Sequence, residues 1–389
     1  MNTHIRTQKG AFSDFELLQC GNSREREKLA DAARIAIRDV LKLNAGEQLL
    51  IITNPKTDAA LISSALYDAA LDCGGRPSLI FQPEKHQIDF AEKTVIAAFN
   101  ARPEAVISLS SRKLGKDEQG IASPYQHEGK GYDHIFHLLQ YGEKSCRAFW
   151  SPSCTLDSFI RTVPINYPLL QRRCASAGAI LSEATSVRVT APGGTDITIG
   201  LGGRLAKSDD GDFASPGSGG NLPAGEVFIS PENGVSEGVI AFDGSICLLE
   251  GEILIKTPIV CAVSGGFITG ISGAAEAEEL KKTINAACEN ARAFEAQGKL
   301  PAGKGELYAK NAKNIGELGI GLNPAALITG NMLEDEKAFH TCHFAIGENY
   351  DNDAPALIHL DGLVRNPTII AKLPCGTDFV IEKDGEFML

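Results

Sequence analysis

The pattern of apolar residues changes near Ser186, and this change most constrains the fold. Before it, helical periodicities alternate with short apolar runs. Such alternation is typical of a parallel sheet covered by helices. The predicted helices span residues 22–43, 58–73, 90–100 and 167–181, and the predicted strands span 48–52, 77–81 and 105–109. Asn22, three residues before Glu25, is expected to cap the first helix.

After Ser186 the chain consists mainly of short apolar runs bounded by Gly, Pro or Asp. SVRVTA and TDITIGL flank a Pro-Gly-Gly turn and predict a β-hairpin. One long helix is predicted at 274–297, and the Gly/Ser/Pro-rich residues 209–225 are expected to form a long loop. We therefore predict an α/β N-terminal domain over 1–183, with a parallel sheet flanked by helices. A mainly β metal-binding catalytic domain with one long helix is predicted over 184–389.

Composition excludes several partners. The net charge of −12 and the lack of a Lys/Arg block argue against nucleic-acid binding. The polar N-terminus has no apolar core of a secretory signal, and no run of eighteen apolar residues predicts a membrane span. The ten cysteines form no CxxC pair and are expected to be reduced, which indicates a cytoplasmic protein.

Metal-ligand residue types concentrate in the last third of the chain. His359 and Asp361 lie in ALIHLDG, where strand periodicity directs both side chains to one face. His343 lies in TCHFAIG, and Tyr350 follows a turn that could return its phenol toward the imidazole. Taken singly, a hydrogen-bonded surface pair and a packed tyrosine are the commoner explanations. His340 is expected to face away from His343.

Two glutamates lead into apolar runs. Glu226 in GEVF and Glu317 in GELGIG each follow a glycine, and a carboxylate is costly to bury without a cation or donor. Together with His343, Tyr350, His359 and Asp361, they predict one metal site, although either glutamate alone fits a solvated strand end. His134 and His137 have i, i+3 spacing, but their apolar neighbours favour a partly buried helix face.

At these residues the chain resembles the aminopeptidase T (aminopeptidase S) family of leucyl aminopeptidases. The resemblance covers most of the chain and is sharpest over PGGTDITIGLGGR, NLPAGEVFISP, GELGIGLNP, EDEKAFHTCHFAIGENY and IHLDGLV. It implies a homodimeric, cytoplasmic metalloaminopeptidase that removes N-terminal residues from peptide substrates. Two divalent ions (Zn, Co or Mn) would activate a water molecule. The implied metal ligands are Glu226, Glu317, His343, Tyr350, His359 and Asp361.

The resemblance leaves individual roles open. Glu317 is expected to bridge the two ions, Glu226 is either a ligand or the general base, and Tyr350 is either a ligand or an oxyanion donor. These three residues are the predicted catalytic set. The interval between His343 and His359 is shorter than in that family, and His340 stands where a glycine is expected.

A second resemblance gives the alternative function. SGGFITGISGAAEAEEL followed by LGIGLNP is similar to the iron-dependent dihydroxypyridine dioxygenases, which share the fold and open an aromatic ring. A mononuclear Fe(II) site would then use His343, His359 and Asp361. That family has a histidine in place of Glu317 and lacks the GEVF glutamate, so the two glutamates favour the hydrolase. A non-catalytic small-molecule binder is the third hypothesis.

Overall fold

A computed structural model describes residues 23–86 and 89–389, and the predicted cap Asn22 lies outside them. The chain folds into two compact units. The first comprises the chain up to Tyr167 and returns at Gly211–Pro223; the second comprises Pro168–Asp210 and Ala224–Leu389. These limits differ from the predicted boundary between residues 183 and 184.

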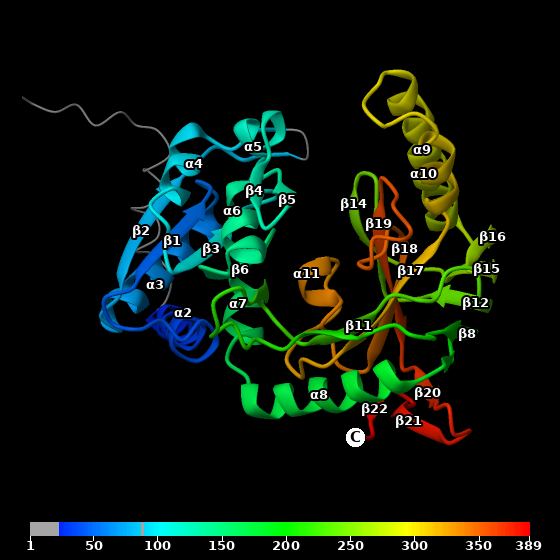
Figure 1. Cartoon of the computed structure of the whole chain (residues 1–389). Helices are drawn as coiled ribbons and strands as arrows, with labels where there is room; N and C mark the ends of the chain where they lie inside the picture. Colours follow the sequence, from blue (N-terminus) through cyan, green and yellow to red (C-terminus); the bar gives the residue numbers. More distant parts are fainter. Residues whose placement is uncertain (1–22, 87–88) are drawn as a thin grey trace, which may run out of the picture. The chain divides into compact units, whose positions relative to one another are not determined.

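The first unit contains a five-stranded parallel sheet of order β10-β6-β3-β1-β2. Strands β1, β2, β3 and β6 are labelled in Figure 1. Apolar runs such as β3, in which every residue is buried, form strands because helices cover both faces. The strands are β1 (Gln48–Thr53), β2 (Arg76–Phe81), β3 (Ala105–Leu109), β6 (Arg147–Trp150) and β10 (Gly219–Asn221), with a separate hairpin of β4 (Tyr125–His127) and β5 (Lys130–Tyr132).

The helices of this unit are α2 (Ser23–Ile35), α3 (Thr57–Asp72), α4 (Lys93–Phe99), α5 (Glu118–Ala122), α6 (Ile135–His137) and α7 (Leu156–Thr162). Helices α2 and α6 each continue into a π-helical turn, at Ala36–Val40 and Leu138–Gly142. Part of the segment predicted as a long loop is the edge strand β10. It pairs with β6, and a Cβ at Gly219 would lie 2.5 Å from the Ala148 carbonyl oxygen. This close approach explains why glycine, which weakens the sequence signal for a strand, occupies the position.

The second unit is built on two antiparallel sheets. The seven-stranded sheet has the order β14-β13-β19-β18-β17-β11-β9, and the eight-stranded sheet has the order β16-β15-β12-β8-β7-β20-β21-β22. The strands of the first are β9 (Lys207–Asp209), β11 (Glu226–Ile229), β13 (Ser245–Leu248), β14 (Gly251–Leu254), β17 (Ile315–Gly321), β18 (Thr341–Gly347) and β19 (His359–Arg365). Those of the second are β7 (Ser186–Thr190), β8 (Asp196–Gly200), β12 (Glu237–Phe242), β15 (Ile259–Ser264), β16 (Phe267–Ser272), β20 (Thr368–Lys372), β21 (Asp378–Lys383) and β22 (Glu386–Phe387).

Four helices belong to this unit: α8 (Tyr167–Glu183), α9 (Ala275–Ala296), α10 (Gly305–Asn311) and α11 (Met332–Asp335). The long helix predicted at 274–297 is α9, and the predicted hairpin is the antiparallel pair β7–β8. The predicted fold class, a parallel α/β part followed by a mainly β part, is confirmed. No helix in the described part of the chain is long and apolar enough to cross a membrane.

Candidate metal centre

The candidate site lies on one face of the seven-stranded sheet. Residues directly paired across antiparallel strands point to the same face, and so do alternate residues of one strand. Glu226 pairs with Gly321. On the central strands, Gly319 pairs with His343, Ala345 lies between Glu317 and Asp361, and Gly347 pairs with His359. In these pairs the partner of each functional side chain is a glycine or alanine, which leaves room above the sheet. On their other sides, His343 pairs with Leu363 and Glu226 pairs with Asp209.

Gly319 shows how tight this arrangement is. A Cβ at this position would lie 2.0 Å from His343 Nε2. The imidazole of His343 thus occupies the space that any larger residue at 319 would need. His343 itself is completely buried.

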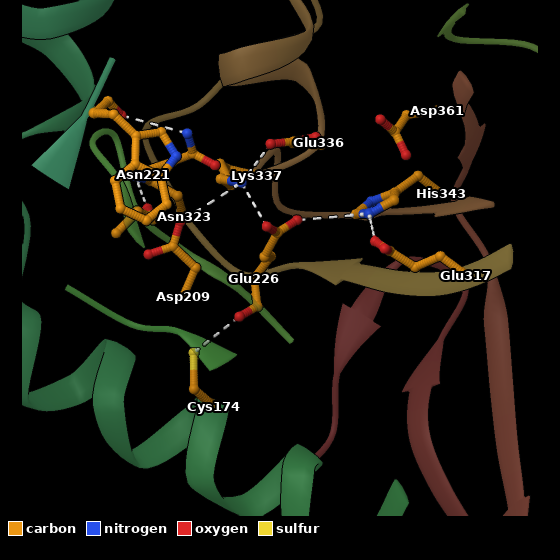
Figure 2. A network of polar contacts seen from close by, with 12 residues as sticks. Cys174, Asp209, Asn221, Glu226, Glu317, Asn323, Glu336, Lys337, His343 and Asp361 are labelled. Atoms are coloured by element: carbon orange, nitrogen blue, oxygen red, sulfur yellow. Dashed lines mark hydrogen bonds and ion pairs between the residues drawn. The ribbon is translucent and has the colours of Figure 1, made fainter. Parts of the chain in front are cut away.

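Glu317 stands between the two histidines. Its Oε1 lies 3.0 Å from His343 Nε2, and its Oε2 lies 3.7 Å from His359 Nε2. His359 Nε2 is also 3.2 Å from Asp361 Oδ1, so the HxD pair projects to one face as the strand periodicity predicts. Glu226 Oε2 reaches within 3.5 Å of His343 Nε2. Figure 2 shows Glu226, His343 and Glu317 linked in sequence, with Asp361 directed toward them.

Two groups of three side chains in the described residues bring ligand atoms within 4.8 Å of one another. Glu226, Glu317 and His343 form the first group; Glu317, His359 and Asp361 form the second. Five of the six predicted ligands therefore converge, and Glu317 is common to both groups.

Tyr350, the sixth predicted residue, packs beside this cluster. Its ring lies 5.1 Å from the ring of His359 and 5.1 Å from that of Phe228, and half of the residue is exposed. Partial burial and then the carboxylates of Glu317 and Asp361 raise the pKa of the phenol above its usual range. The Tyr350 phenol is therefore neutral and available as a hydrogen-bond donor at the edge of the cluster.

The carboxylates favour positive charge in the cluster. Burial lowers the pKa of both histidines, but the neighbouring carboxylates outweigh it and raise the pKa of His343 to about 9 and of His359 to about 10. Burial likewise raises the pKa of Asp361, but His359 outweighs it and lowers that pKa to about 2. Burial raises the pKa of Glu317. A cation among these oxygens would supply the same compensation as the imidazolium protons.

Two buried carboxylate oxygens fit a metal ion. Glu317 Oε2 and Asp361 Oδ1 are buried and meet no hydrogen-bond criterion among the described residues, and their neighbour within ion-pair distance is His359 Nε2, at 3.7 and 3.2 Å. His359 Nδ1 lies 2.9 Å from the carbonyl oxygen of Glu348, and donation to that oxygen would leave Nε2 free to bind a metal. A hydrogen bond from the second ring nitrogen to a carbonyl oxygen is the usual way in which a metal-binding histidine is oriented. The second group therefore has the donor set and orientation that a divalent ion needs.

The sequence reasoning did not single out Lys337. This side chain is completely buried, and its Nζ lies 2.6 Å from Glu226 Oε1, 2.5 Å from Glu336 Oε1 and 3.8 Å from Asp209 Oδ2 (Figure 2). Burial opposes the charge on Lys337, but these carboxylates outweigh it and raise the pKa of the ammonium group further. Burial also raises the pKa of Glu336 to about 8. The only available signal was a lysine inside an otherwise acidic run, EDEK, followed by apolar residues.

His340 and His134 do not belong to either ligand group found among the described residues. His340 Nδ1 lies 2.7 Å from the Gly385 carbonyl oxygen and is not part of either ligand group. His134 is buried; its Nδ1 accepts from the Phe136 amide, and its Nε2 lies 3.3 Å from the carbonyl oxygen of Gly115. Burial lowers the pKa of His134 to about 4. His134 is therefore a neutral, structural histidine.

Sequence comparisons relate the chain to oxygenases. The family model of 2,5-dihydroxypyridine 5,6-dioxygenase matches residues 155–345. A curated 2,5-dihydroxypyridine 5,6-dioxygenase of Pseudomonas putida KT2440 is 32% identical over 111 residues, which are 28% of this chain and 32% of that protein. The matched region of the family model contains Glu226, Glu317 and His343 and ends before His359.

Two solved structures share the fold. That of the 2,5-dihydroxypyridine dioxygenase from P. putida KT2440 has a TM-score of 0.66 at 17% identity, covering 93% of this chain and 97% of the other. Wild-type AmpT from Thermus thermophilus has a TM-score of 0.62 at 17% identity, covering 93% and 99%. At this identity the likeness shows the fold alone.

These comparisons overturn the predicted hydrolase. The prediction of a metalloaminopeptidase is wrong, because the sequence-level matches are to a dioxygenase and the aminopeptidase is supported only by fold. They also give no support to a pair of Zn, Co or Mn ions. One physical reason for the wrong prediction is Glu226. Its buried carboxylate needs a compensating cation, and the ammonium of Lys337 supplies that charge in place of a second metal ion.

Proposed function

We propose that this chain is an iron-dependent dioxygenase that opens the ring of a dihydroxylated nitrogen heteroaromatic compound. The observation that carries the proposal is the family match over residues 155–345, which contains three of the five converging metal-ligand side chains. The curated relative named for this reaction supports it over a shorter segment. In such a reaction both oxygen atoms of O2 enter the product as a ring bond breaks.

We propose that His359, Asp361 and Glu317 hold the ion. Their ligand atoms lie within 4.8 Å of one another, and the buried Glu317 Oε2 and Asp361 Oδ1 both lie beside His359 Nε2. The group has one imidazole and two carboxylates, whereas the facial triad of non-haem iron oxygenases has two imidazoles and one carboxylate. His343, 3.0 Å from Glu317, is the nearest second imidazole. Ferrous iron bound here would supply the electron transfer that lets O2 react with an aromatic ring.

The surrounding side chains have roles in proton transfer and orientation. His343 lies 3.0 Å from Glu317 and 3.5 Å from Glu226, and a protonated imidazole at this position could donate its proton to an oxygen of the substrate. The neutral phenol of Tyr350 can donate a hydrogen bond to a substrate oxygen. Lys337 Nζ lies 2.6 Å from Glu226 Oε1 and holds that carboxylate beside His343.

Oxygen consumption tests this function. Protein loaded with Fe(II) without air is given 2,5-dihydroxypyridine in an oxygen electrode, and the loss of ring absorbance is followed in parallel. We expect equimolar loss of O2 and of the ring. Iron-loaded protein that consumes no O2 with any dihydroxypyridine isomer would exclude the proposal.

A matched pair of histidine variants locates the activity. His359→Asn should abolish iron binding and O2 uptake, because it removes the imidazole of the proposed ligand group. His340→Asn should retain both, because His340 is outside the cluster and asparagine tolerates its φ of +67°. Equal activity of the two variants would contradict the ligand assignment.

We also propose a cytoplasmic homodimer. The nine cysteines from Cys73 onward are all free thiols, as is usual in a reducing compartment. The dimer is the expectation from the family resemblance. Light scattering on the purified protein should give twice the chain mass of 41.3 kDa, and a mass of one chain would exclude the dimer.

A further inference from the structure

The first unit has a cavity of its own, about 520 Å³ in volume. It lies at the carboxyl ends of three adjacent parallel strands, because Ser108, Trp150 and Asn221 line it from the ends of β3, β6 and β10. Ligands of open α/β sheets bind outside the carboxyl ends of the strands. The volume is within the range of small-molecule sites, about 300–1,000 Å³.

One wall of the cavity is aromatic. The ring of Phe136 lies 6.4 Å from that of Trp150 in an edge-to-face arrangement and 6.2 Å from that of His137. The ring of His137 in turn lies 5.9 Å from that of Tyr141, which is half exposed. Such a row of rings presents flat, polarisable surface to a planar ligand.

The cavity also carries positive charge, although the protein as a whole has a net charge of −12. Arg112, Lys113 and Lys116 line it. Arg112 pairs with Glu84 at 2.8 Å, but no described carboxylate lies within ion-pair distance of Lys113 or Lys116. These two ammonium groups are available to an anionic ligand.

The two acidic side chains of the lining make contacts of their own, apart from Lys113 and Lys116. The carboxylate of Asp117 is turned toward the protein and accepts from the amides of Gly120 and Ile135 and from the hydroxyl of Tyr125. Asp133 is paired with His137 at 3.4 Å.

We propose that this cavity binds a planar aromatic carboxylate. Its ring would stack on the wall formed by Trp150, Phe136 and Tyr141, and its carboxylate would bind Lys113 and Lys116. Every group in this arrangement belongs to the first unit, so the proposal does not depend on iron or on the oxygenase reaction.

Calorimetry on the full chain tests the site with 2-naphthoate and its uncharged isostere 2-naphthamide. We expect the naphthoate to bind and the amide to bind at least about tenfold more weakly, a difference of one charge-assisted contact. Raising the salt concentration should weaken the binding of 2-naphthoate and leave that of 2-naphthamide unchanged. Absence of naphthoate binding, or equal binding of the two compounds, would overturn the proposal.

Charge-matched variants locate the ligand. Lys113→Ala/Lys116→Ala should weaken naphthoate binding by about tenfold or more. Lys93→Ala/Lys130→Ala, which removes two exposed lysines of the same unit outside the lining, should not. The His359→Asn variant should bind naphthoate like the unmodified protein. Loss of binding in His359→Asn, with retention in the Lys113/Lys116 variant, would place the ligand in the second unit and refute this inference. Because no step needs O2 or iron, a failed oxygenase assay leaves the result unaffected.

Discussion

Lys337 is the buried cation around which the acidic part of the cluster is arranged. It contacts Glu226 and Glu336 at 2.6 and 2.5 Å and has no exposed surface. Lys337→Met should lower the free energy of unfolding by about 3–5 kcal/mol, because it leaves buried carboxylates without their partner. Urea denaturation measures this change.

A second substitution separates charge from packing. Lys337→Met/Glu226→Gln should recover part of the lost free energy of unfolding, since it removes one of the stranded charges. Lys372→Met, at an exposed position of β20, should be nearly neutral. A double variant no more stable than Lys337→Met alone would show that packing, not charge, explains the loss.

Glu382 gives the fold a pH dependence outside the site. This residue of β21 is buried, its Oε2 has no hydrogen-bond partner among the described residues, and burial raises its pKa to about 8. Between the ordinary pKa of 4.5 and pH 8 the folded protein keeps a proton that the unfolded chain releases, so stability falls as pH rises through this window. Glu382→Gln removes this loss.

Unfolding curves at two pH values measure the effect. At pH near 8.5 Glu382→Gln should be more stable than the unmodified protein by about 1–3 kcal/mol, the cost of an unsatisfied buried polar group. Near pH 4.5 the gain should vanish. Asp378→Asn, exposed on the same strand, should show no such difference. A gain of the same size at both pH values would contradict the assignment.

Strands β17 and β18 must approach closely to bring the ligands together, and Gly319 permits this. Gly319→Ala should displace His343, because the new Cβ would lie 2.0 Å from Nε2. We expect at least about a tenfold loss of O2 uptake, the usual result of misplacing a group by an ångström or so. Oxygen-electrode assays and the circular dichroism of the variant test this.

Gly270→Ala is the matched control for that substitution. Gly270 lies in β16 of the other sheet, and a Cβ there would meet only Ala262 Cβ at 3.8 Å. It should leave O2 uptake unchanged. A fully active Gly319→Ala variant would show that the position of His343 does not matter for the reaction.

Periodicity in the sequence predicted most of these elements but not all of the site. Strand β3 and the long helix α9 follow the predicted ranges closely because their apolar patterns are strong. Strand β10 was missed because its glycines carry no apolar signal. Lys337 was missed because two of its carboxylate partners, Asp209 and Glu226, come from distant segments, which no local pattern reveals.

The sequence analysis predicted a hydrolase, and this prediction was wrong for a chemical reason. Histidine and carboxylate ligands serve hydrolytic and oxygen-activating metals alike, so their convergence does not identify the reaction. Glu226 and Glu317 were taken to favour the hydrolase. The contact of Glu226 with Lys337 gives that glutamate a partner without a second metal ion.

At the scale of the whole molecule, the two proposed binding sites belong to different units. The converging carboxylates and histidines all belong to the second unit, and the cationic aromatic cavity belongs to the first. The chain passes between the units at 167/168, 210/211 and 223/224. The return at Gly211–Pro223 adds β10 to the parallel sheet and so completes one side of the cavity.

Hydrogen exchange read by mass spectrometry tests this division. A divalent ion at 100 times its dissociation constant stabilises the folded state by about 2.7 kcal/mol, which slows exchange about a hundredfold where opening releases the ion. With Co(II) as an air-stable probe, we expect this protection in β17, β18 and β19. Strands β1 and β3 should be unaffected, and the His359→Asn variant should show no protection anywhere. Equal protection of β1 and β19 would mean that the two units open together. Metal binding would then stabilise both units and not the second unit alone.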